Sequence, residues 1–253
     1  MFEKILFHRK IFFSWHMLAA FVVFNFATIR ADIPSYIRAC GRKNPNYDQC
    51  IINNLNNVRD HLCEGIPEFN LSSIEPIVID RIAVFDAENF KLHVKNVKVT
   101  RVCDYTVQYA RTDSNRLYLE LEFRFNRLIV STEYEFNAHV LVPLKNEGLL
   151  SISLDKPSAR AKMNLKVVTK NGKSQIYVSK INTNIKVSSF EYKFDNDEKD
   201  QLHQILNNFV DNNKNDILTK VLPIFEKKLG EIIISIFNSV TRSNYEKLFP
   251  ETA

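Results

Sequence analysis

Cysteines offer the most distinctive side-chain chemistry in this 253-residue sequence. The four cysteines are Cys40, Cys50, Cys63 and Cys103. They can form disulfides in an oxidising compartment, with three possible pairings, or bind a metal ion. A structural zinc site favours closely spaced cysteine or histidine ligands, and this spacing is absent. We predict structural disulfides and no metal site; the turn-rich loop between Cys40 and Cys50 could bring these two together.

Residues that could support catalysis follow no recognisable arrangement. His61, His93, His139 and His203 are scattered, and their spacing implies no partner. The sequence contains no G-x-S-x-G elbow, no H-E-x-x-H motif and no glycine-rich phosphate loop. Paired carboxylates that meet only in the folded chain remain an open alternative. We therefore predict that the protein is not an enzyme and uses no cofactor.

The first 31 residues have the pattern of a secretory signal peptide. Lys4, Arg9 and Lys10 precede an apolar run over residues 11–26, which is short for a transmembrane span. Ala31 is a small residue suited to cleavage, so the mature chain is predicted to begin at Asp32. An uncleaved membrane anchor is the alternative. The mature protein is expected to be extracellular, with no stable membrane insertion, because no second long apolar run follows.

Removing the leader changes the charge argument. The whole chain has 34 basic and 29 acidic residues, and residues 32–253 retain 30 and 28, a formal charge of +2. Nucleic acid is therefore not an expected partner. About 220 residues suit one domain, predicted over 32–253.

Secretion would also permit glycosylation. Asn70-Leu71-Ser72 is the only N-glycosylation sequon, and it lies in a segment expected to be exposed. Asn70 is therefore a candidate glycosylation site.

The longest periodic stretch spans residues 195–241. Its apolar residues recur every three or four positions, as on one face of an α-helix roughly 60 Å long. Asp195 and Glu198 have the spacing of a capping box, and Pro223 predicts a kink or short break. A shorter amphipathic helix is predicted over 50–62, ending near Gly65.

Between residues 77 and 194 the period changes to two. Apolar residues alternate with polar ones over 117–126 and again over 130–142, which predicts antiparallel strands with one apolar face. Further strands are predicted over 90–102, 105–110, 149–154, 159–169 and 175–194. Asn171-Gly172 predicts a two-residue hairpin. Since strands this long must twist and curl, we predict an α+β fold with a highly curved antiparallel sheet around one long helix.

The candidate ligand-binding residues lie on the inward faces of this helix and sheet. We predict that they line an elongated apolar cavity, with a fully packed, dry core as the alternative. The helix candidates are Val221, Phe225, Leu229, Ile232 and Ile236, and the strand candidates are Phe123, Phe125, Tyr134 and Phe136.

Short motifs along the whole mature chain resemble the insect takeout and juvenile-hormone-binding protein family. Their order and spacing carry the resemblance: Pro34-Ser35-Tyr36-Ile37, Cys40, Cys50, Gly65-Ile66-Pro67-Glu68, Glu75-Pro76-Ile77, Lys170-Asn171-Gly172-Lys173, Phe194-Asp195-Asn196 and Tyr245-Glu246-Lys247-Leu248-Phe249-Pro250-Glu251. The resemblance implies a Cys40–Cys50 disulfide and a super-roll enclosing a hydrophobic tunnel. Cys63 and Cys103, candidates for a second disulfide, depart from the usual family pattern, as does the low glycine content.

The functional prediction is a secreted, non-enzymatic carrier of a small hydrophobic ligand. A juvenile hormone-like terpenoid, a fatty acid or another lipid would fit the resemblance, and insect hemolymph would be the setting. The alternative is a secreted interaction or signalling protein with only a structural lipid. A monomer is expected, and an unknown receptor is left open as a partner.

Overall fold

The computed structural model describes residues 33–139, 143–195 and 201–252, which belong to one compact unit, Ile33–Ala253. The predicted leader over 1–31, the capping residue Glu198 and the strand end at 140–142 lie outside the described residues. None of the helices in the described ranges is long and apolar enough to cross a membrane.

The strands form two antiparallel sheets instead of the single predicted one. The first has the order β1-β2-β5-β6-β9 and the second β3-β4-β7-β8. The strand bounds are β1 (Ile77–Ala87), β2 (Phe90–Thr100), β3 (Tyr105–Thr112), β4 (Tyr118–Phe125), β5 (Arg127–His139), β6 (Pro143–Asp155), β7 (Ser158–Lys170), β8 (Lys173–Lys186) and β9 (Phe190–Phe194). The predicted strand over 175–194 is therefore two strands, β8 and β9, in different sheets.

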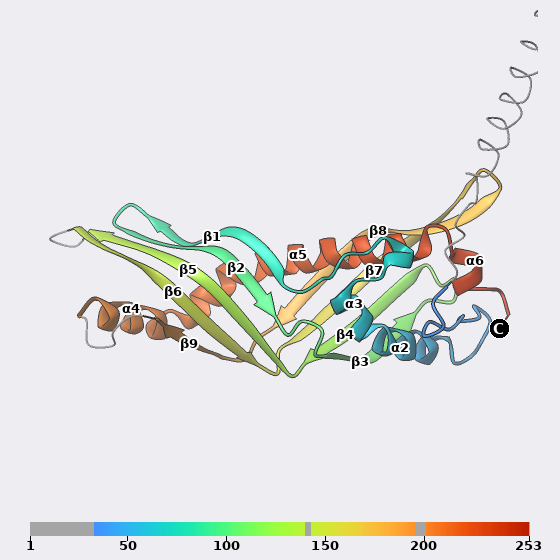
Figure 1. The fold of residues 1–253 in the computed structure, drawn as a ribbon, viewed down its shortest axis with the longest axis horizontal. Helices are drawn as coiled ribbons and strands as arrows, with labels where there is room; N and C mark the ends of the chain where they lie inside the picture. Colours follow the sequence, from blue (N-terminus) through green and yellow to red (C-terminus); the bar gives the residue numbers. More distant parts are fainter. Residues whose placement is uncertain (1–32, 140–142, 196–200, 253) are drawn as a thin grey trace, which may run out of the picture. The chain divides into compact units, whose positions relative to one another are not determined.

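The chain crosses between the sheets at short connections that meet in the middle. β4 and β5 are separated by Asn126 alone. The Asn126 amide donates to the Asp104 carbonyl at 3.3 Å, and its carbonyl accepts from the Lys156 amide at 2.9 Å. Lys156 has a positive φ of 47°, which sharpens the turn from β6 into β7. These bonds link the β2–β3, β4–β5 and β6–β7 connections to one another. The two sheets therefore separate at the same place along the molecule (Figure 1).

Strand alternation follows the predicted period. In β5, Val130, Thr132, Tyr134, Phe136 and Ala138 are all buried, with more exposed residues between them. The predicted hairpin is confirmed, because Lys170 pairs with Lys173 across two residues. Asn171 and Gly172 have φ values of 52° and 72°, as a type I′ turn requires.

Two short helices, α2 (Tyr47–Asn57) and α3 (Arg59–Glu64), occupy the region predicted as one helix. Gly65 ends α3 at a φ of 94° and a ψ of 156°, a conformation that is open to glycine and rare for other residues. A 3₁₀ turn, η1 (Pro67–Phe69), leads towards β1. The Asn56 side chain of α2 receives the Val107 amide at 2.8 Å and donates to the Val107 carbonyl at 3.1 Å, so α2 covers the edge strand β3.

The predicted long helix is interrupted, but not at Pro223. The helices are α4 (Gln201–Asn212), α5 (Lys214–Thr241) and the short α6 (Tyr245–Leu248). α5 continues through Pro223, so the loss of one amide donor there does not end the helix. The division falls at Asn213, which leaves the helical conformation at φ −121° and ψ 19°. Its side chain donates to the Phe209 carbonyl at 2.7 Å, which competes with the helical backbone bonds.

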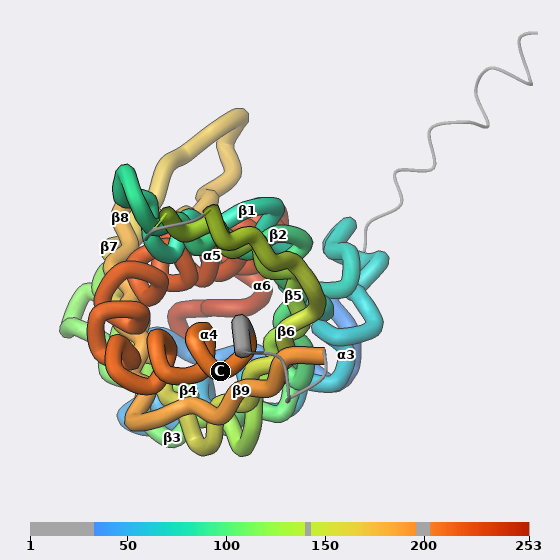
Figure 2. The backbone as a smooth tube through the Cα atoms, turned by 90° about the vertical axis from the view of Figure 1, so that its left-hand side faces the viewer, coloured from blue at the N-terminus to red at the C-terminus, as the bar shows by residue number. Residues whose placement is uncertain are grey.

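α5 lies along the edges of both sheets, in contact with β8 and β1. It runs past both sheets in Figure 1, and in the end-on view of Figure 2 it forms one side of a ring of strands. Its side chains join all three apolar clusters: Phe225 packs on the first, Phe237 on the second and Val240 on the third. The prediction was one sheet wrapped around a central helix. The structure instead has two sheets, and α5 packs along an edge strand of each.

Candidate apolar cavity

A cavity of about 370 Å³ lies between α5, α2 and the inner faces of both sheets. Its lining is almost entirely apolar and includes seven of the nine residues predicted from the sequence. These are Val221, Phe225, Leu229, Ile232, Ile236, Phe123 and Phe125. The predicted helix face and one predicted strand thus border the same space.

Tyr134 and Phe136 do not line the cavity, which corrects the prediction for these two residues. Their side chains are 0% and 2% exposed and belong to the first apolar cluster. Tyr134 packs edge-on against Phe194 with ring centroids 4.8 Å apart, and its hydroxyl lies 3.3 Å from His203 Nε2 of α4. α4 and β9 cover the part of β5 that carries Tyr134 and Phe136. The inward side chains there belong to the packed core and do not border the cavity.

The apolar face of α5 is only partly covered by protein. Within this 28-residue helix, only Gly230 and Thr241 are buried. Apolar side chains such as Leu229, Ile232 and Ile236 are partly exposed and line the cavity. Half-covered apolar side chains along a long helix are costly unless another apolar surface covers them.

Polar side chains hold α5 against the edge of the second sheet. Glu226 accepts the Ile185 amide of β8 at 2.8 Å, and Asn238 accepts the Val178 amide at 3.0 Å. The Thr241 hydroxyl donates to the Ile176 carbonyl at 2.9 Å. These bonds satisfy backbone groups of an edge strand. They fix the helix at the rim of the sheet, so its apolar face is left towards the cavity.

Gly230 allows the closest approach of α5 to β8. A Cβ atom at this position would lie 3.3 Å from Ile181 Cγ2. The helix therefore packs tightly against β8 on one side while it borders empty space on the other.

One end of the cavity is polar, which the sequence did not indicate. Arg42 Nη1 donates to the Tyr245 hydroxyl at 2.9 Å, and the Arg116 guanidinium lies 4.6 Å from the centre of the Tyr47 ring. All four of these residues line the cavity. Burial raises the pKa of Tyr47, and the nearby charges of Arg116 and Arg42 only partly oppose this effect, so its hydroxyl stays neutral. Arg42 and Arg116 are far apart in the chain, so no spacing pattern could have paired them.

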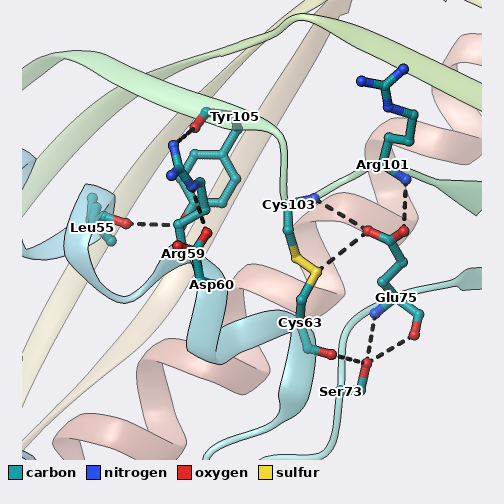
Figure 3. The surroundings of a disulfide bond; sticks show 9 residues. All are labelled: Leu55, Arg59, Asp60, Cys63, Ser73, Glu75, Arg101, Cys103 and Tyr105. Carbon is teal, nitrogen blue, oxygen red and sulfur yellow. Dashed lines mark hydrogen bonds and ion pairs between the residues drawn. A yellow bond between two sulfur atoms is a disulfide. The ribbon is translucent and has the colours of Figure 1, made fainter.

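Both cysteine pairs are bonded in the structure. Cys40 and Cys50 have Cα atoms 5.8 Å apart, and Cys63 and Cys103 have Cα atoms 6.1 Å apart. The Glu75 carboxylate beside the second disulfide accepts the Arg101 amide at 2.8 Å (Figure 3). The possible ligand atoms of Cys63, Glu75 and Cys103 lie within 4.8 Å of one another, but both sulfurs are used in the disulfide. This cluster therefore joins α3 to the β2–β3 connection and does not offer thiolate ligands.

The scattered histidines and the predicted glycosylation site Asn70 do not line the cavity. The His61 ring stacks on Tyr36 at 3.7 Å, and His93 Nδ1 lies 2.8 Å from an Arg81 nitrogen. No histidine of the described residues lines the cavity. Asn70 is exposed and has a φ of 54° after η1. Its side chain is accessible, as a glycosylation site requires, and its use stays a prediction.

The fold and the cavity together define a takeout-like protein: two antiparallel sheets with a long C-terminal helix beside an apolar space. The crystal structure of Epiphyas postvittana Takeout 1 matches with a TM-score of 0.68 at 14% identity, over 85% of this chain and 100% of that chain. The chain belongs to the haemolymph juvenile hormone binding protein family, whose model matches residues 18–250. The family resemblance predicted from the sequence is confirmed.

Two further crystal structures match with lower TM-scores. Lipopolysaccharide binding protein matches with a TM-score of 0.41 at 11% identity, over 72% of this chain and 36% of that chain. Mmm1 matches with a TM-score of 0.25 at 10% identity, over 67% and 73%. Neither similarity bears on the function of this chain. No curated protein sequence matches it.

Proposed function

We propose that this protein is a secreted carrier that holds one small hydrophobic ligand in the cavity beside α5. The observation that carries the proposal is the partly exposed apolar face of a helix with only two buried residues. Residues 32–253 would form the carrier domain, and the seven cavity-lining predicted residues would contact the ligand. Binding alone accounts for the site, so the proposal includes neither catalysis nor a cofactor.

The size of the cavity supports a ligand with one aliphatic chain. A volume of about 370 Å³ falls at the small end of the range for ligand pockets. A chain of fifteen or so carbons would bury about 400 Å² of apolar surface. This burial contributes roughly 10 kcal/mol of favourable free energy before the entropic costs of binding are subtracted. Association and ordering oppose this by about 4–15 kcal/mol, so the net gain is at most about 6 kcal/mol, which corresponds to a dissociation constant of roughly tens of micromolar.

Secretion is supported by the disulfides and by family membership. Both cysteine pairs are oxidised, which is typical of extracellular proteins. A terpenoid resembling juvenile hormone and a fatty acid are both compatible with the apolar lining, in keeping with the name of the family.

The test is extraction of the protein purified from its native source. Denaturation and organic extraction, followed by mass spectrometry, should recover an aliphatic or terpenoid molecule at about one equivalent per chain. The delipidated protein should then bind N-phenyl-1-naphthylamine with a fluorescence increase. Absence of both the extracted molecule and dye binding would overturn the carrier proposal. A lipid that never exchanges with added ligand would indicate the alternative, a structural lipid.

A further inference from the structure

The charged residues that line the cavity all have the same sign. They are Arg38, Arg42, Arg116 and Lys228, and the described part of the lining contains no aspartate or glutamate. Two of them, Arg42 and Arg116, meet at one end beside Tyr47 and Tyr245. The cavity thus combines a long apolar wall with a cationic end.

Arg42 has few partners for its charge. Nη1 donates to the Tyr245 hydroxyl, whereas Nε is buried and has no hydrogen-bond acceptor within the described ranges. No ion pair joins Arg42 to a carboxylate there. Glu251, whose carboxylate lies near this guanidinium, pairs with the exposed Lys43. A partly buried guanidinium without a paired carboxylate is unfavourable, because the Tyr245 hydroxyl and ring replace only part of its lost hydration.

Arg116 is better satisfied but adds to the positive charge. Its Nε donates to the Arg42 carbonyl at 3.2 Å, and Nη1 lies 3.8 Å from the Asp48 carboxylate. Asp48 also accepts the Thr112 hydroxyl at 2.5 Å, so its charge is shared. Asp48 therefore offsets only part of the charge of Arg116, and it forms no ion pair with Arg42 within the described residues.

The backbone around Arg42 is held from two sides. The Arg42 amide donates to the Pro250 carbonyl at 2.8 Å, and the Cys40 amide donates to the Leu248 carbonyl at 2.7 Å. The Cys40–Cys50 disulfide ties the same loop to α2. Arg42 is thus presented by a rigid frame, which lowers the ordering cost of binding.

We propose that this cationic end binds the carboxylate of a single-chain amphiphile, with Arg42 as its main contact and Arg116 in support. The inference rests on the proposed carrier function and names the ligand class, a fatty acid. A planar carboxylate matches the guanidinium fork, and the aliphatic tail extends along α5. An ester or alcohol of equal length fills the same apolar space without supplying the missing negative charge.

The experiment compares palmitate with methyl palmitate as displacers of N-phenyl-1-naphthylamine from delipidated protein at pH 8. Wild type should bind palmitate about 10- to 100-fold more tightly than the ester, as expected for charge-assisted hydrogen bonds. Arg42→Gln should abolish most of this preference while leaving methyl palmitate binding within about twofold. Lys170→Gln is the charge control, since it removes one positive charge from an exposed residue of the β7–β8 hairpin that does not line the cavity, and it should keep the preference.

The outcomes separate the two proposals. Equal binding of palmitate and its methyl ester by wild type would overturn the inference and leave the carrier function standing. Failure of dye, acid and ester alike to bind wild type would overturn both. Equal weakening of acid and ester by Arg42→Gln, with an unchanged near-ultraviolet circular dichroism spectrum, would show a structural role and also overturn the inference. If Arg42→Gln does not fold, the wild-type preference for palmitate over its methyl ester and the same preference in Arg42→Lys test the inference. Lysine keeps the charge and should retain part of this preference.

Discussion

At the scale of single residues, two glycines at positive φ serve turns with very different surroundings. Gly65 has a φ of 94°, and a Cβ built there would lie 2.9 Å from the Leu71 carbonyl oxygen. Gly172 in the β7–β8 hairpin has a φ of 72° and nothing within 4 Å of such a Cβ. The first position is restricted by backbone conformation and by space, the second by conformation alone.

Gly65→Ala should therefore destabilise the protein more than Gly172→Ala. We expect a loss of about 2–4 kcal/mol at Gly65, where a backbone atom must move, and about 1 kcal/mol at Gly172. Urea unfolding followed by circular dichroism measures both free energies. Equal losses would mean that the η1 region adapts to the added methyl group.

At the scale of the elements, the pairing of α5 with β8 depends on acceptors placed opposite edge amides. Glu226 receives the Ile185 amide at 2.8 Å and the Asn184 side chain at 3.2 Å. Glu231 lies on the same helix but is exposed. Glu226 and Glu231 thus carry the same charge on the same helix, but only Glu226 accepts hydrogen bonds from β8.

Glu226→Ala should lower the free energy of unfolding by about 1–3 kcal/mol, because the Ile185 amide loses its acceptor. Glu226→Gln keeps an acceptor oxygen and should cost less. Glu231→Ala, the matched control, should change stability by less than about 0.5 kcal/mol. Chemical denaturation of all three variants checks the ranking, which a large effect of Glu231→Ala would contradict.

Substitutions that enlarge a side chain distinguish cavity-facing positions of α5 from positions in the packed core. Ile232→Phe places extra volume where the cavity has room, so stability should change little while long-chain ligands bind more weakly. Leu206→Phe, at a side chain with 0% exposure, should cost about 1–3 kcal/mol through overpacking. Thermal melts without ligand and titration with palmitate distinguish the cases. A large stability loss with unchanged binding for Ile232→Phe would contradict the carrier proposal.

At the scale of the whole molecule, α5 makes the two sheets depend on each other. Phe225, Phe237 and Val240 of this one helix pack on three different apolar clusters. The Cys63–Cys103 bond adds a covalent link between segments 40 residues apart in sequence. Neither sheet retains its apolar cover if the helix leaves.

We therefore expect one cooperative unfolding transition for residues 32–253. Calorimetry of delipidated protein should give a van't Hoff enthalpy equal to the calorimetric enthalpy. Added palmitate should raise the midpoint in a concentration-dependent manner, because it binds the folded state. Two resolved transitions would show that the sheets unfold separately despite the shared helix.

Local periodicity in the sequence was sufficient for much of the fold. Alternation along 130–138 identified the buried side of β5, and steps of three or four identified the cavity face of α5. Asn171-Gly172 specified its hairpin because the turn needs two residues at positive φ. The family resemblance supplied the Cys40–Cys50 pairing, which the structure also contains.

Only the tertiary structure decided how these elements divide and what they enclose. Asn126 separates two sheets through backbone bonds to Asp104 and Lys156, partners that no local pattern names. Phe123 lines the cavity whereas Tyr134 is core, although both alternate inward, because α4 packs against the part of β5 that carries Tyr134. Arg42 and Arg116 meet across 74 residues of sequence. Periodicity specifies which side of an element is apolar, but what covers that side depends on contacts between distant parts of the chain.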